Sequence, residues 1–545
     1  MPITDFLEKN ARLHPTEVAL VEINPLRQAH QDITWREFSL IEAASGQKYR
    51  REITWREFDI RANRFANLLF TRGIKKGDKV AILLMNCLEW LPIYFGILKT
   101  GAVVVPMNYR FSADEIKYCI DLSDAKMLVF GEEFIGRIEA VKEKLGITDY
   151  FFVGNDEQTP PFSDNYEKMI TCCSGTVPPV EITDDEDAAI YFSSGTTGFP
   201  KAILHTHHAL VCSAMTEQKH HSQKRDDVFL CIPPLYHTGA KMHWFCSLMS
   251  CSRAVLLRGV SPEWVLRTAA DEKATIVWLL VPWAQDILDS IERGELDLKK
   301  YDLSRWRLMH IGAQPVPPSL IKRWKEVFPN HEYDTNYGLS ESIGPGCVHL
   351  GVENIDKVGA IGKAGYLWET KIVDTDLNEV KNGEVGELMV KGPGVMKCYY
   401  KNPEATVEIK KGDWLLTGDM ARADEDGFIY LVDRKKDVII TGGENLYPVQ
   451  IEDFLRSNSK IKDVAVIGLP DERLGEIAAA IIEVKDGMSM TEDEVIGFCE
   501  SMPRYKRPRK IIFANVPRNA TGKIEKPLLR EKYCGARLVE LQTTK

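Results

Sequence analysis

Long hydrophobic runs are missing from this sequence. The longest of them, such as Ala274–Trp283, is far shorter than the ~20 apolar residues that a helix needs to cross a membrane. The first residues, Met1–Phe6, contain no basic segment followed by an apolar one, which is the pattern of a secretory signal. These two absences predict a protein without a transmembrane segment, located in the cytoplasm.

Excess positive charge is also missing, since the formal net charge is -10. This balance disfavours nucleic acid or anionic lipid as the main partner, although a local basic patch is compatible with it. The twelve cysteines show none of the spacings of metal sites: Cys172 and Cys173 are adjacent, and Cys246 and Cys251 lie five residues apart. We therefore expect free thiols in a reducing compartment.

A third absence concerns nucleotide binding. The common phosphate loop, G-x-x-x-x-G-K-[ST], does not occur in the segment Tyr191–Lys201, where the glycines stand three residues apart and no hydroxyl follows the lysine. The segment nevertheless holds four Ser/Thr hydroxyls, two glycines and a lysine, all of which suit phosphate. The apolar stretch Ala188–Phe192 leads into it and Ala202–Thr206 follows, so the loop is expected between ordered elements. A phosphate loop and a mobile surface loop are both compatible with this segment alone.

One six-residue string occurs twice, as Ile33–Phe38 and Ile53–Phe58. The second copy leads into Asp59–Leu69, which has the spacing of an amphipathic helix. We expect the second copy to occupy the structural position. The first copy is interpreted as part of a duplicated insert, about residues 27–50, in a surface hairpin loop.

The chain is long enough, at 545 residues, for about two to four domains. From Lys79 to Ile311, short apolar runs alternate with helical stretches, which predicts an α/β domain with a largely parallel sheet. The expected strands are Val80–Met85, Ala102–Pro106, Lys126–Phe130, Tyr150–Val153, Val228–Pro233, Arg253–Leu257, Thr275–Val281 and Leu308–Ile311, and the expected helices are Leu88–Lys99, Ser112–Leu122 and Ile135–Lys144.

The sequence pattern changes twice after this domain. From about Gly359, short strands with Gly and Asp/Asn turns, such as Glu384–Val390, predict a small β-rich unit. The charged run Asp433–Asp437 then precedes a compact α+β module of about 100 residues. We place the boundary at this run, with an N-terminal domain over residues 1–433, a hinge at 434–436 and a C-terminal domain over 437–545.

Several motifs, in this order, resemble those of the adenylate-forming superfamily of acyl-CoA synthetases, firefly luciferase and nonribosomal peptide synthetase adenylation domains. They are Ser193–Lys201, Gly312–Pro315, Asn336–Glu341, Trp414–Asp419, Tyr430–Asp437 and Pro517–Lys526. The resemblance covers about residues 5 to 530. It implies an α/β fold, in which a large N-terminal domain of two α/β subdomains plus a β-barrel is joined to a small mobile α+β C-terminal domain.

The resemblance also implies a reaction in two steps. A carboxylate attacks the α-phosphate of Mg-ATP to give an acyl adenylate and pyrophosphate, and a thiol, usually that of coenzyme A, then displaces AMP. ATP, coenzyme A and a small-molecule carboxylic acid are the implied substrates, and Mg²⁺ is the implied metal. Because the transition state spreads negative charge over the phosphoryl oxygens, preorganised donors and cations stabilise it.

An ATP site made from these motifs is implied in the same way. Thr196 would face the metal and Glu341 would ligate Mg²⁺, a cation that needs few carboxylates. Tyr337 would stack on adenine, Ser340 would touch the α-phosphate and Asp419 would accept both ribose hydroxyls. The whole implied set is Ser193, Ser194, Gly195, Thr196, Thr197, Gly198, Lys201, Gly312, Ala313, Gln314, Pro315, Asn336, Tyr337, Gly338, Ser340, Asp419, Arg434 and Lys523.

The C-terminal motifs imply a moving part. Lys523 would bridge the carboxylate and the α-phosphate during adenylation, Arg434 would also reach the ribose, and Lys436 falls at the hinge. Members of the family then rotate the small domain, which withdraws the lysine. The same rotation would bring the loop with Gly442, Gly443 and Glu444 to line the tunnel for coenzyme A.

The segment Pro233–Ala240 resembles one wall of the acyl pocket in acyl-CoA and aryl-CoA ligases. It carries His237 and lacks the aspartate with which amino-acid-activating relatives bind an ammonium, which argues against an amino-acid substrate. If the next segment is helical, Lys241 and Trp244 lie on the same face as His237. The implied pocket residues are Tyr236, His237, Lys241, Trp244, Ala313 and Gly338, with Trp278 and Trp283 as further candidates.

A crowded aromatic pocket favours a compact acid, meaning an aromatic, alicyclic or short- to medium-chain one. Packing of these aromatic side chains in the core explains them equally well. Lys241 and His243 are polar where the family usually has apolar or small residues, which leaves a dicarboxylate or an oxygenated acid open.

Other functions are also open. An acyl-AMP ligase that loads a carrier protein would share all these motifs, and so would a long-chain fatty acyl-CoA synthetase. The catalytic candidates are Thr196, His237, Glu341 and Lys523. A luciferase-like oxidation and a catalytically inactive scaffold are disfavoured, the latter because Thr196, Glu341, Asp419, Arg434 and Lys523 occur together. A monomer and a homodimer are equally compatible with the sequence.

Overall fold

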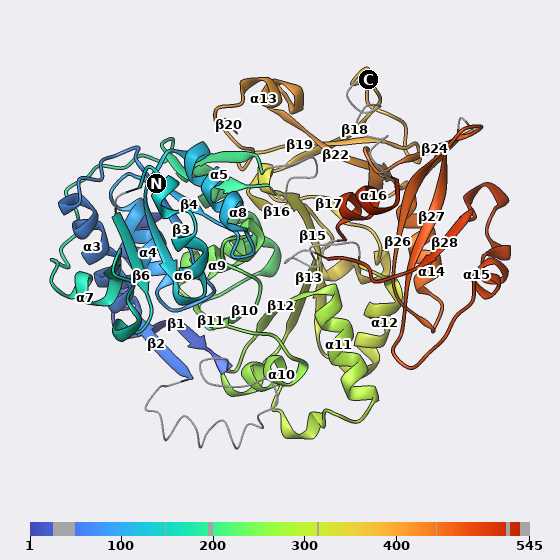
Figure 1. Ribbon diagram of the computed structural model, residues 1–545. Helices are drawn as coiled ribbons and strands as arrows, with labels where there is room; N and C mark the ends of the chain where they lie inside the picture. The colour runs from blue at the N-terminus through green and yellow to red at the C-terminus, as the bar shows by residue number, and fades with distance from the viewer. Residues whose placement is uncertain are drawn as a thin grey trace.

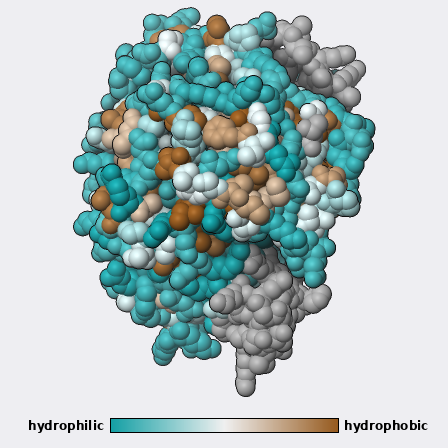
Figure 2. All heavy atoms as spheres, turned by 90° about the vertical axis from the view of Figure 1, so that its left-hand side faces the viewer, coloured by the Kyte–Doolittle hydropathy of each residue, from teal (hydrophilic) through white to brown (hydrophobic). Residues whose placement is uncertain are grey.

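The computed structural model describes most of the chain (Figure 1). The described residues are 1–25, 49–147, 149–193, 200–312, 316–442, 444–518 and 524–534. Within these ranges, every helix is too short or too polar to cross a membrane. All twelve cysteines are free thiols, as expected. On the face shown in Figure 2, hydrophobic residues lie in small groups among hydrophilic ones.

The first α/β subdomain is built on a sheet with the order β20-β9-β8-β4-β3-β5-β6-β7. All neighbouring pairs from β8 to β7 are parallel, and the β8–β9 and β9–β20 pairs are antiparallel, so the prediction of a largely parallel sheet is confirmed. The strands are β3 (Lys79–Leu83), β4 (Val103–Pro106), β5 (Ala125–Gly131), β6 (Asp149–Val153), β7 (Asp164–Asn165), β8 (Asp187–Phe192), β9 (Ala202–Thr206) and β20 (Cys398–Tyr399). The helices are α3 (Trp55–Thr71), α4 (Trp90–Leu98), α5 (Ala113–Ser123), α6 (Ile135–Glu139) and α7 (Tyr166–Thr171).

The second subdomain has a sheet with the order β14-β13-β12-β10-β11-β1-β2, parallel except for the β1–β2 hairpin. Its strands are β1 (Val18–Ile23), β2 (Arg50–Thr54), β10 (Val228–Cys231), β11 (Arg253–Leu257), β12 (Ile276–Leu280), β13 (Leu308–Gly312) and β14 (Glu332–Asp334). Its helices are α1 (Thr4–Leu13), α8 (His207–His221), α9 (Thr238–Ser250), α10 (Pro262–Asp271), α11 (Val281–Glu292) and α12 (Pro318–Val327).

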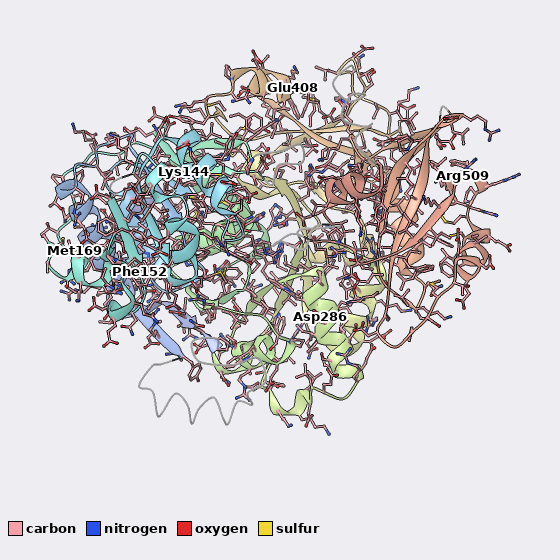
Figure 3. All side chains as sticks on the ribbon, viewed as in Figure 1. Lys144, Phe152, Met169, Asp286, Glu408 and Arg509 are labelled. Carbon is pink, nitrogen blue, oxygen red and sulfur yellow. The ribbon has the colours of Figure 1, made fainter. Side chains whose placement is uncertain are left out.

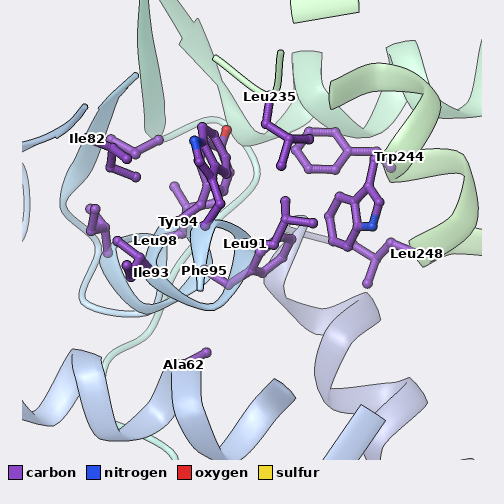
Figure 4. Close-up of a cluster of buried hydrophobic side chains, with 14 of the residues drawn as sticks. Ala62, Ile82, Leu91, Ile93, Tyr94, Phe95, Leu98, Leu235, Trp244 and Leu248 are labelled. Atoms are coloured by element: carbon purple, nitrogen blue, oxygen red, sulfur yellow. The ribbon is translucent and has the colours of Figure 1, made fainter. Parts of the chain in front are cut away.

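One hydrophobic core joins the two subdomains around α4 and α9 (Figure 4). The sequence of α4 is apolar on every side, and all nine of its residues are buried. The rings of Phe95 on α4 and Trp244 on α9 meet edge to face, with 5.6 Å between centroids. Such a helix can only be stable between two layers, which fixes the relative position of the subdomains. Figure 3 contrasts the buried Phe152 with Glu408 and Arg509, which lie exposed at the periphery.

The second copy of the repeated string occupies the structural position, as expected. Ile53 and Thr54 end β2, and Thr54 begins α3 through a capping box with Glu57. Trp55 and Phe58 are buried in the core. Of the expected insert 27–50, residues 27–48 lie outside the described residues, and β1 and β2 on either side pair antiparallel, as a hairpin requires.

The β-rich unit consists of two sheets, with orders β15-β16-β17 and β18-β19-β22-β21, and β23 pairs with β22. The predicted β-barrel would need these strands to close into a ring, and the described pairings form no closed ring. The elements are β15 (Asn336–Leu339), β16 (Gly344–His349), β17 (Lys363–Ala364), β18 (Glu369–Val373), β19 (Gly386–Lys391), α13 (Pro403–Ile409), β21 (Lys410–Lys411), β22 (Trp414–Ala423) and β23 (Ile429–Arg434).

The C-terminal unit has its own sheet, with the order β25-β24-β27-β26 and β28 beside β27. It lies at one end of the molecule and has separate hydrophobic clusters (Figure 1). Its elements are β24 (Ile439–Thr441), β25 (Glu444–Leu446), α14 (Pro448–Arg456), β26 (Ile461–Asp471), β27 (Gly475–Val484), α15 (Glu492–Phe498), β28 (Lys510–Phe513) and α16 (Lys526–Cys534). The α+β composition agrees with the expectation, and the chain passes from β23 to β24 through the charged run.

A buried ion-pair network attaches β2 to the start of α4. Arg51 donates hydrogen bonds to Glu22 and to both carboxylate oxygens of Glu89, the latter at 2.6 and 3.0 Å. Glu22 is 0% exposed and Glu89 is 4% exposed. Burial alone would raise the pKa of Glu89, but the charge of Arg51 outweighs it and lowers this pKa below the ordinary 4.5.

Replacing Arg51 should therefore destabilise the N-terminal domain strongly. We expect Arg51→Gln to cost about 3–5 kcal/mol, because two buried carboxylates lose their cation. Scanning calorimetry should show a melting temperature several degrees lower, whereas Arg56→Gln, at an exposed position of α3, should leave it unchanged. Since the pKa of Glu89 is lowered, its contribution is present above pH 4.5 and is lost below it. Equal melting temperatures of Arg51→Gln and the wild type at pH 7 would contradict this account.

Candidate functional site

The loop predicted to bind phosphate joins two antiparallel strands, β8 and β9. Its two ends are fixed to each other: the N–H of Ser193 donates to the carbonyl oxygen of Lys201 at 3.0 Å, and the N–H of Lys201 donates to Oγ of Ser193 at 3.1 Å. The predicted residues Ser194, Gly195, Thr196, Thr197 and Gly198 lie outside the described residues. The structure thus places the loop between ordered elements, which is where phosphate loops act.

Tyr399 connects this loop to Glu341. The Nζ of Lys201 lies 4.8 Å from the centroid of the Tyr399 ring, and the Tyr399 hydroxyl donates to Oε1 of Glu341 at 2.7 Å. The residue next to Glu341 is held as well, since Nε2 of His205 on β9 lies 2.8 Å from the carbonyl oxygen of Ser340. Two predicted motifs, more than a hundred residues apart in the sequence, therefore meet.

Tyr337, Asp419 and Arg434 form a second group. The Tyr337 hydroxyl donates to Oδ2 of Asp419 at 2.5 Å, and Nε of Arg434 lies 2.6 Å from Oδ1 of the same carboxylate. Asp419 and Arg434 are direct cross-strand partners on β22 and β23. Burial, together with the neighbouring charge of Asp419, raises the pKa of the Tyr337 phenol well above its usual value. The phenol therefore stays protonated and acts as a donor.

The end of β13 lies beside this region. A Cβ on Gly312 would lie 3.8 Å from Oδ1 of Asn336 and 3.9 Å from Nε1 of Trp278. The side-chain amide of Asn336 donates to both carboxylate oxygens of Glu217, each at 3.0 Å. Gly338 continues β15 toward Glu341, and the predicted residues Ala313, Gln314 and Pro315 lie outside the described residues.

His237 begins helix α9. Its Nδ1 accepts from the N–H of Gly239 at 3.2 Å, so the histidine caps the helix that follows the Pro-Pro-Leu-Tyr segment. A Cβ on Gly239 would lie only 2.7 Å from the Trp278 ring, so glycine is needed for this close approach. The neighbouring Tyr236 packs edge to face on Tyr109, with 5.4 Å between centroids. His237, Gly239, Trp278 and Gly312 thus share one wall.

Lys241 and Trp244 pack against other buried side chains. Trp244 is 0% exposed and contacts Phe58, Phe95 and Phe245 in the core, so packing explains it, and its place in the acyl pocket stays a prediction. Nζ of Lys241 donates to the Tyr191 hydroxyl at 3.1 Å and lies over three aromatic rings, at 4.2 to 4.8 Å from their centroids. Helix α9 is buried on nearly all sides, so a shared helical face with His237 does not mean a shared pocket.

The C-terminal predictions are only partly visible. Lys436 is exposed between β23 and β24, and Gly442 has a left-handed φ of 58° in the turn between β24 and β25. The N–H of Gly442 donates to the carbonyl oxygen of Leu474, within the same unit. Gly443, Lys523 and the side chain of Glu444 lie outside the described residues.

Sequence reasoning missed Tyr399 and His205, which link the predicted motifs. Neither belongs to a motif with a recognisable spacing. Tyr399 is on the short strand β20, and only the cross-strand position of β20 beside β9 brings it to Lys201. It also missed a buried group of histidines and carboxylates around Glu217, whose members come from five elements.

Comparison with known proteins bears on the identity of this site. A family model described as AMP-binding enzyme matches residues 7–400, and one described as AMP-binding enzyme C-terminal domain matches residues 450–523. The chain belongs to the AMP-binding enzyme family. This finding confirms the resemblance to adenylate-forming enzymes of the acyl-CoA and aryl-CoA synthetase branch.

Named AMP-binding enzymes resemble the chain over nearly its full length. The chain is 34% identical over 485 residues to the long-chain-fatty-acid–CoA ligase FadD13 of Mycobacterium tuberculosis, and the match covers 87% of this chain and 91% of the relative. Among solved structures, anthranilate CoA ligase AuaEII in complex with anthranoyl-AMP has a TM-score of 0.85 at 26% identity, covering 98% and 97%. The o-succinylbenzoate CoA synthetase of Bacillus subtilis, in complex with ATP and magnesium, has a TM-score of 0.80 at 25% identity, covering 97% and 99%.

These AMP-binding enzymes act on chemically different acids, while the transfer to coenzyme A is common to them. This chain is accordingly an AMP-forming carboxylate–CoA ligase, and ATP and coenzyme A are its substrates. The acid is a separate question, because the relatives differ in it.

Removing the Tyr337 hydroxyl tests the group formed by Tyr337, Asp419 and Arg434. We expect Tyr337→Phe to raise the KM for ATP about tenfold or more, since a hydrogen bond to a charged group contributes about 1.5–3 kcal/mol. Tyr150→Phe is the matched control, because the hydroxyl of Tyr150 has no hydrogen-bond partner among the described residues and lies on β6. Steady-state AMP release at varied ATP measures both variants, and an unchanged KM in Tyr337→Phe would contradict the assignment.

Proposed function

We propose that the enzyme activates a compact carboxylic acid in a site that converges on Tyr337, Glu341, Asp419, Arg434 and the 193–201 loop, and that it transfers the acyl group to coenzyme A. The observation that supports this proposal most directly is the pair of contacts described above. One links Lys201 to Glu341 through Tyr399, and the other links Tyr337 and Arg434 to Asp419. Both bring together residues from motifs that are far apart in the sequence.

In this proposal Asp419 accepts the two ribose hydroxyls, with Arg434 beside it, and Tyr337 lies against the adenine. Asp419 is 4% exposed and already has a phenol and a guanidinium as partners, so it is held in one orientation before the nucleotide arrives. A carboxylate fixed in this way need not reorganise on binding. Ser340 and the loop hydroxyls would face the phosphates.

Magnesium fits the donor set at Glu341. Oε1 of Glu341 accepts from Tyr399, and Oε2 has no hydrogen bond among the described residues, so one carboxylate oxygen can face a cation. Mg²⁺ binds through one or two carboxylates plus phosphate oxygens and water. We propose Glu341 and Thr196 as its protein ligands. When bound, the ion would neutralise charge on the phosphates, while Lys201 adds a positive charge from the protein.

Lys523 is proposed as the cation that bridges the attacking carboxylate and the α-phosphate. It lies in the C-terminal domain, beyond the proposed hinge at 434–436, and a rotation there would exchange it for the Gly442–Glu444 loop. Arg434, the last residue of β23, belongs both to the ribose site and to the start of this hinge. Rotation about Lys436 can therefore occur without moving Asp419.

The two half-reactions should respond differently to Lys523→Ala. We expect acyl-adenylate formation, measured as pyrophosphate release, to fall by about 10²-fold or more, because a charge in contact with the transition state is removed. Thioesterification of a supplied acyl adenylate should change little. Lys532→Ala, at an exposed position near the end of α16, is the control. Equal loss in both halves would refute this role for Lys523.

The acid is proposed to be compact: aromatic, alicyclic or short- to medium-chain. Trp278 supports this, because its indole, 3% exposed, fills the space between Gly239 and Gly312 on the wall that also carries His237. A large ring at this position leaves less room for a long chain. His237 and Tyr236 remain as proposed pocket residues, together with Gly338 and Ala313.

Trp278→Ala should widen the acid specificity. In competition assays with benzoate, cyclohexanecarboxylate, hexanoate, adipate and palmitate, we expect the wild type to prefer one of the compact acids. The variant should gain at least about tenfold in relative kcat/KM for palmitate, because a buried ring of this size contributes a few kcal/mol to packing. Trp264→Ala, on α10 and not among the pocket candidates, is the control and should keep the wild-type order.

If the wild type clearly preferred palmitate in this competition assay, the result would contradict the compact pocket and favour a long-chain fatty acyl-CoA synthetase. AMP release that does not depend on coenzyme A would favour transfer to a carrier protein. We also propose a reducing, cytoplasmic location, which is supported by the twelve free thiols.

A further inference from the structure

A group of four histidines and two carboxylates is buried beneath the site. Its members are Glu217, His221, His243, His310, Asp334 and His349, and none is more than 3% exposed. They come from α8, α9, β13, β14 and β16, so the fold, and no single motif, brings them together. None of them has a role in the proposed transfer of the acyl group.

Three of the imidazoles have ring nitrogens close to one another. One ring nitrogen each of His221, His243 and His310 lies within 4.8 Å of the other two. Nε2 of His221 and Nδ1 of His310 are within hydrogen-bonding distance, at 3.0 Å. The ring centroid of His243 lies 4.5 Å from that of His310 and 5.1 Å from that of His221. In a tetrahedral zinc site with bonds of about 2.0–2.1 Å, ligand nitrogens lie roughly 3.3 Å apart. The His221 and His243 rings are stacked, with 7° between their planes, so one of them must turn for both nitrogens to face the same ion.

His243 lacks the hydrogen bonds that a buried imidazole normally has. Neither of its ring nitrogens is in hydrogen-bonding geometry with another described residue, although Oε2 of Glu217 lies 3.6 Å from Nδ1. An unsatisfied buried polar group costs about 1–3 kcal/mol. A bound ion would give this nitrogen a partner.

The two carboxylates share one histidine as their shortest ion-pair partner. His349 lies between them, with Nε2 3.3 Å from Glu217 and Nδ1 3.1 Å from Asp334. Their other ion pairs with described residues are also to histidines, and no lysine or arginine within the described ranges reaches either carboxylate. Both carboxylates are 0% exposed, so two buried negative charges face a single bridging imidazole. A divalent ion among the other imidazoles would supply further positive charge.

We propose that His221, His243 and His310 bind one divalent transition-metal ion of the zinc class. Imidazole nitrogen suits zinc, cobalt and nickel, whereas magnesium and calcium prefer oxygen, so this ion is distinct from the magnesium that accompanies ATP. Three histidines leave the fourth position of a tetrahedral ion for water or a carboxylate. Glu217 and Asp334 act as charged partners of the imidazoles, which orients metal-binding histidines in proteins.

The metal site would support one wall of the acyl pocket. The His243 ring packs on Trp278, with 4.7 Å between centroids, and Glu217 holds the side-chain amide of Asn336. An ion here would fix α8, α9 and β13 relative to one another, and through Trp278 and Asn336 it would fix the surface behind Gly312. This inference does not depend on the identity of the acid or on the roles proposed for Lys523 and Glu341.

Metal analysis of the purified full-length protein tests the proposal without any substrate. After removal of loosely bound ions by gel filtration, elemental analysis should find about one zinc-class ion per chain. Protein stripped with a chelator should melt at a lower temperature and regain its stability with Zn²⁺ but not with Mg²⁺. Co²⁺ bound in its place should show the visible absorption of a tetrahedral ion without sulfur-to-metal bands, which separates this site from the thiols.

Two variants identify the ligands. His243→Gln should lower the metal content at least about tenfold. The matched control is His207→Gln, because His207 is also fully buried and neither of its ring nitrogens has a hydrogen-bond partner among the described residues, but it lies outside the cluster. His207→Gln should keep the metal. If His243→Gln does not fold, the Co²⁺ spectrum of the wild type decides.

Wild-type protein that contains no such ion and takes up neither Zn²⁺ nor Co²⁺ would overturn the proposal, as would equal metal content in the two variants. Those results would leave the cluster as a hydrogen-bonded polar wall behind the acyl pocket. Failure of the acyl-CoA assay alone would concern the proposed acid and not the metal site.

Discussion

The carboxylate of Asp419 is the constraint on which the rest of the site depends. It is almost fully buried, and it receives a hydrogen bond from Tyr337 and an ion pair from Arg434. These three residues belong to β15, β22 and β23, so one charge connects the strand that leads to Glu341 with the strand that ends at the proposed hinge. A buried carboxylate with two strong partners has one orientation, and in the proposed site that orientation sets where a nucleotide ribose can lie.

The same constraint is compatible with the proposed rotation of the C-terminal domain. Arg434 lies at the last position of β23 and is paired in register with Asp419, and the chain turns to the C-terminal unit directly after it. Everything that holds the nucleotide in the proposal, apart from Lys523, stays on the N-terminal side of that point. A rotation beyond Arg434 then changes which residues complete the site without disturbing the nucleotide.

Much of this organisation could be predicted from the sequence. Buried parallel strands appear as apolar runs, and these runs located β3, β10 and β13 to within a few residues. The resemblance to adenylate-forming enzymes singled out Tyr337, Asp419 and Arg434, and the structure brings these three side chains together. The place of Trp244 could not be decided from the sequence, since α9 is buried on opposite faces and helical spacing cannot tell which face meets the pocket. Tyr399 and the buried histidines depend on contacts between distant elements, which no local pattern records.

A crystal structure with a non-hydrolysable acyl-adenylate analogue bound is the most direct test of the central claim. The account predicts that both ribose hydroxyls lie within hydrogen-bonding distance of Asp419 and that the adenine ring lies against Tyr337, with the phosphate analogue near the 193–201 loop and Ser340. An analogue bound elsewhere, with Asp419 still engaged only by Tyr337 and Arg434, would contradict it.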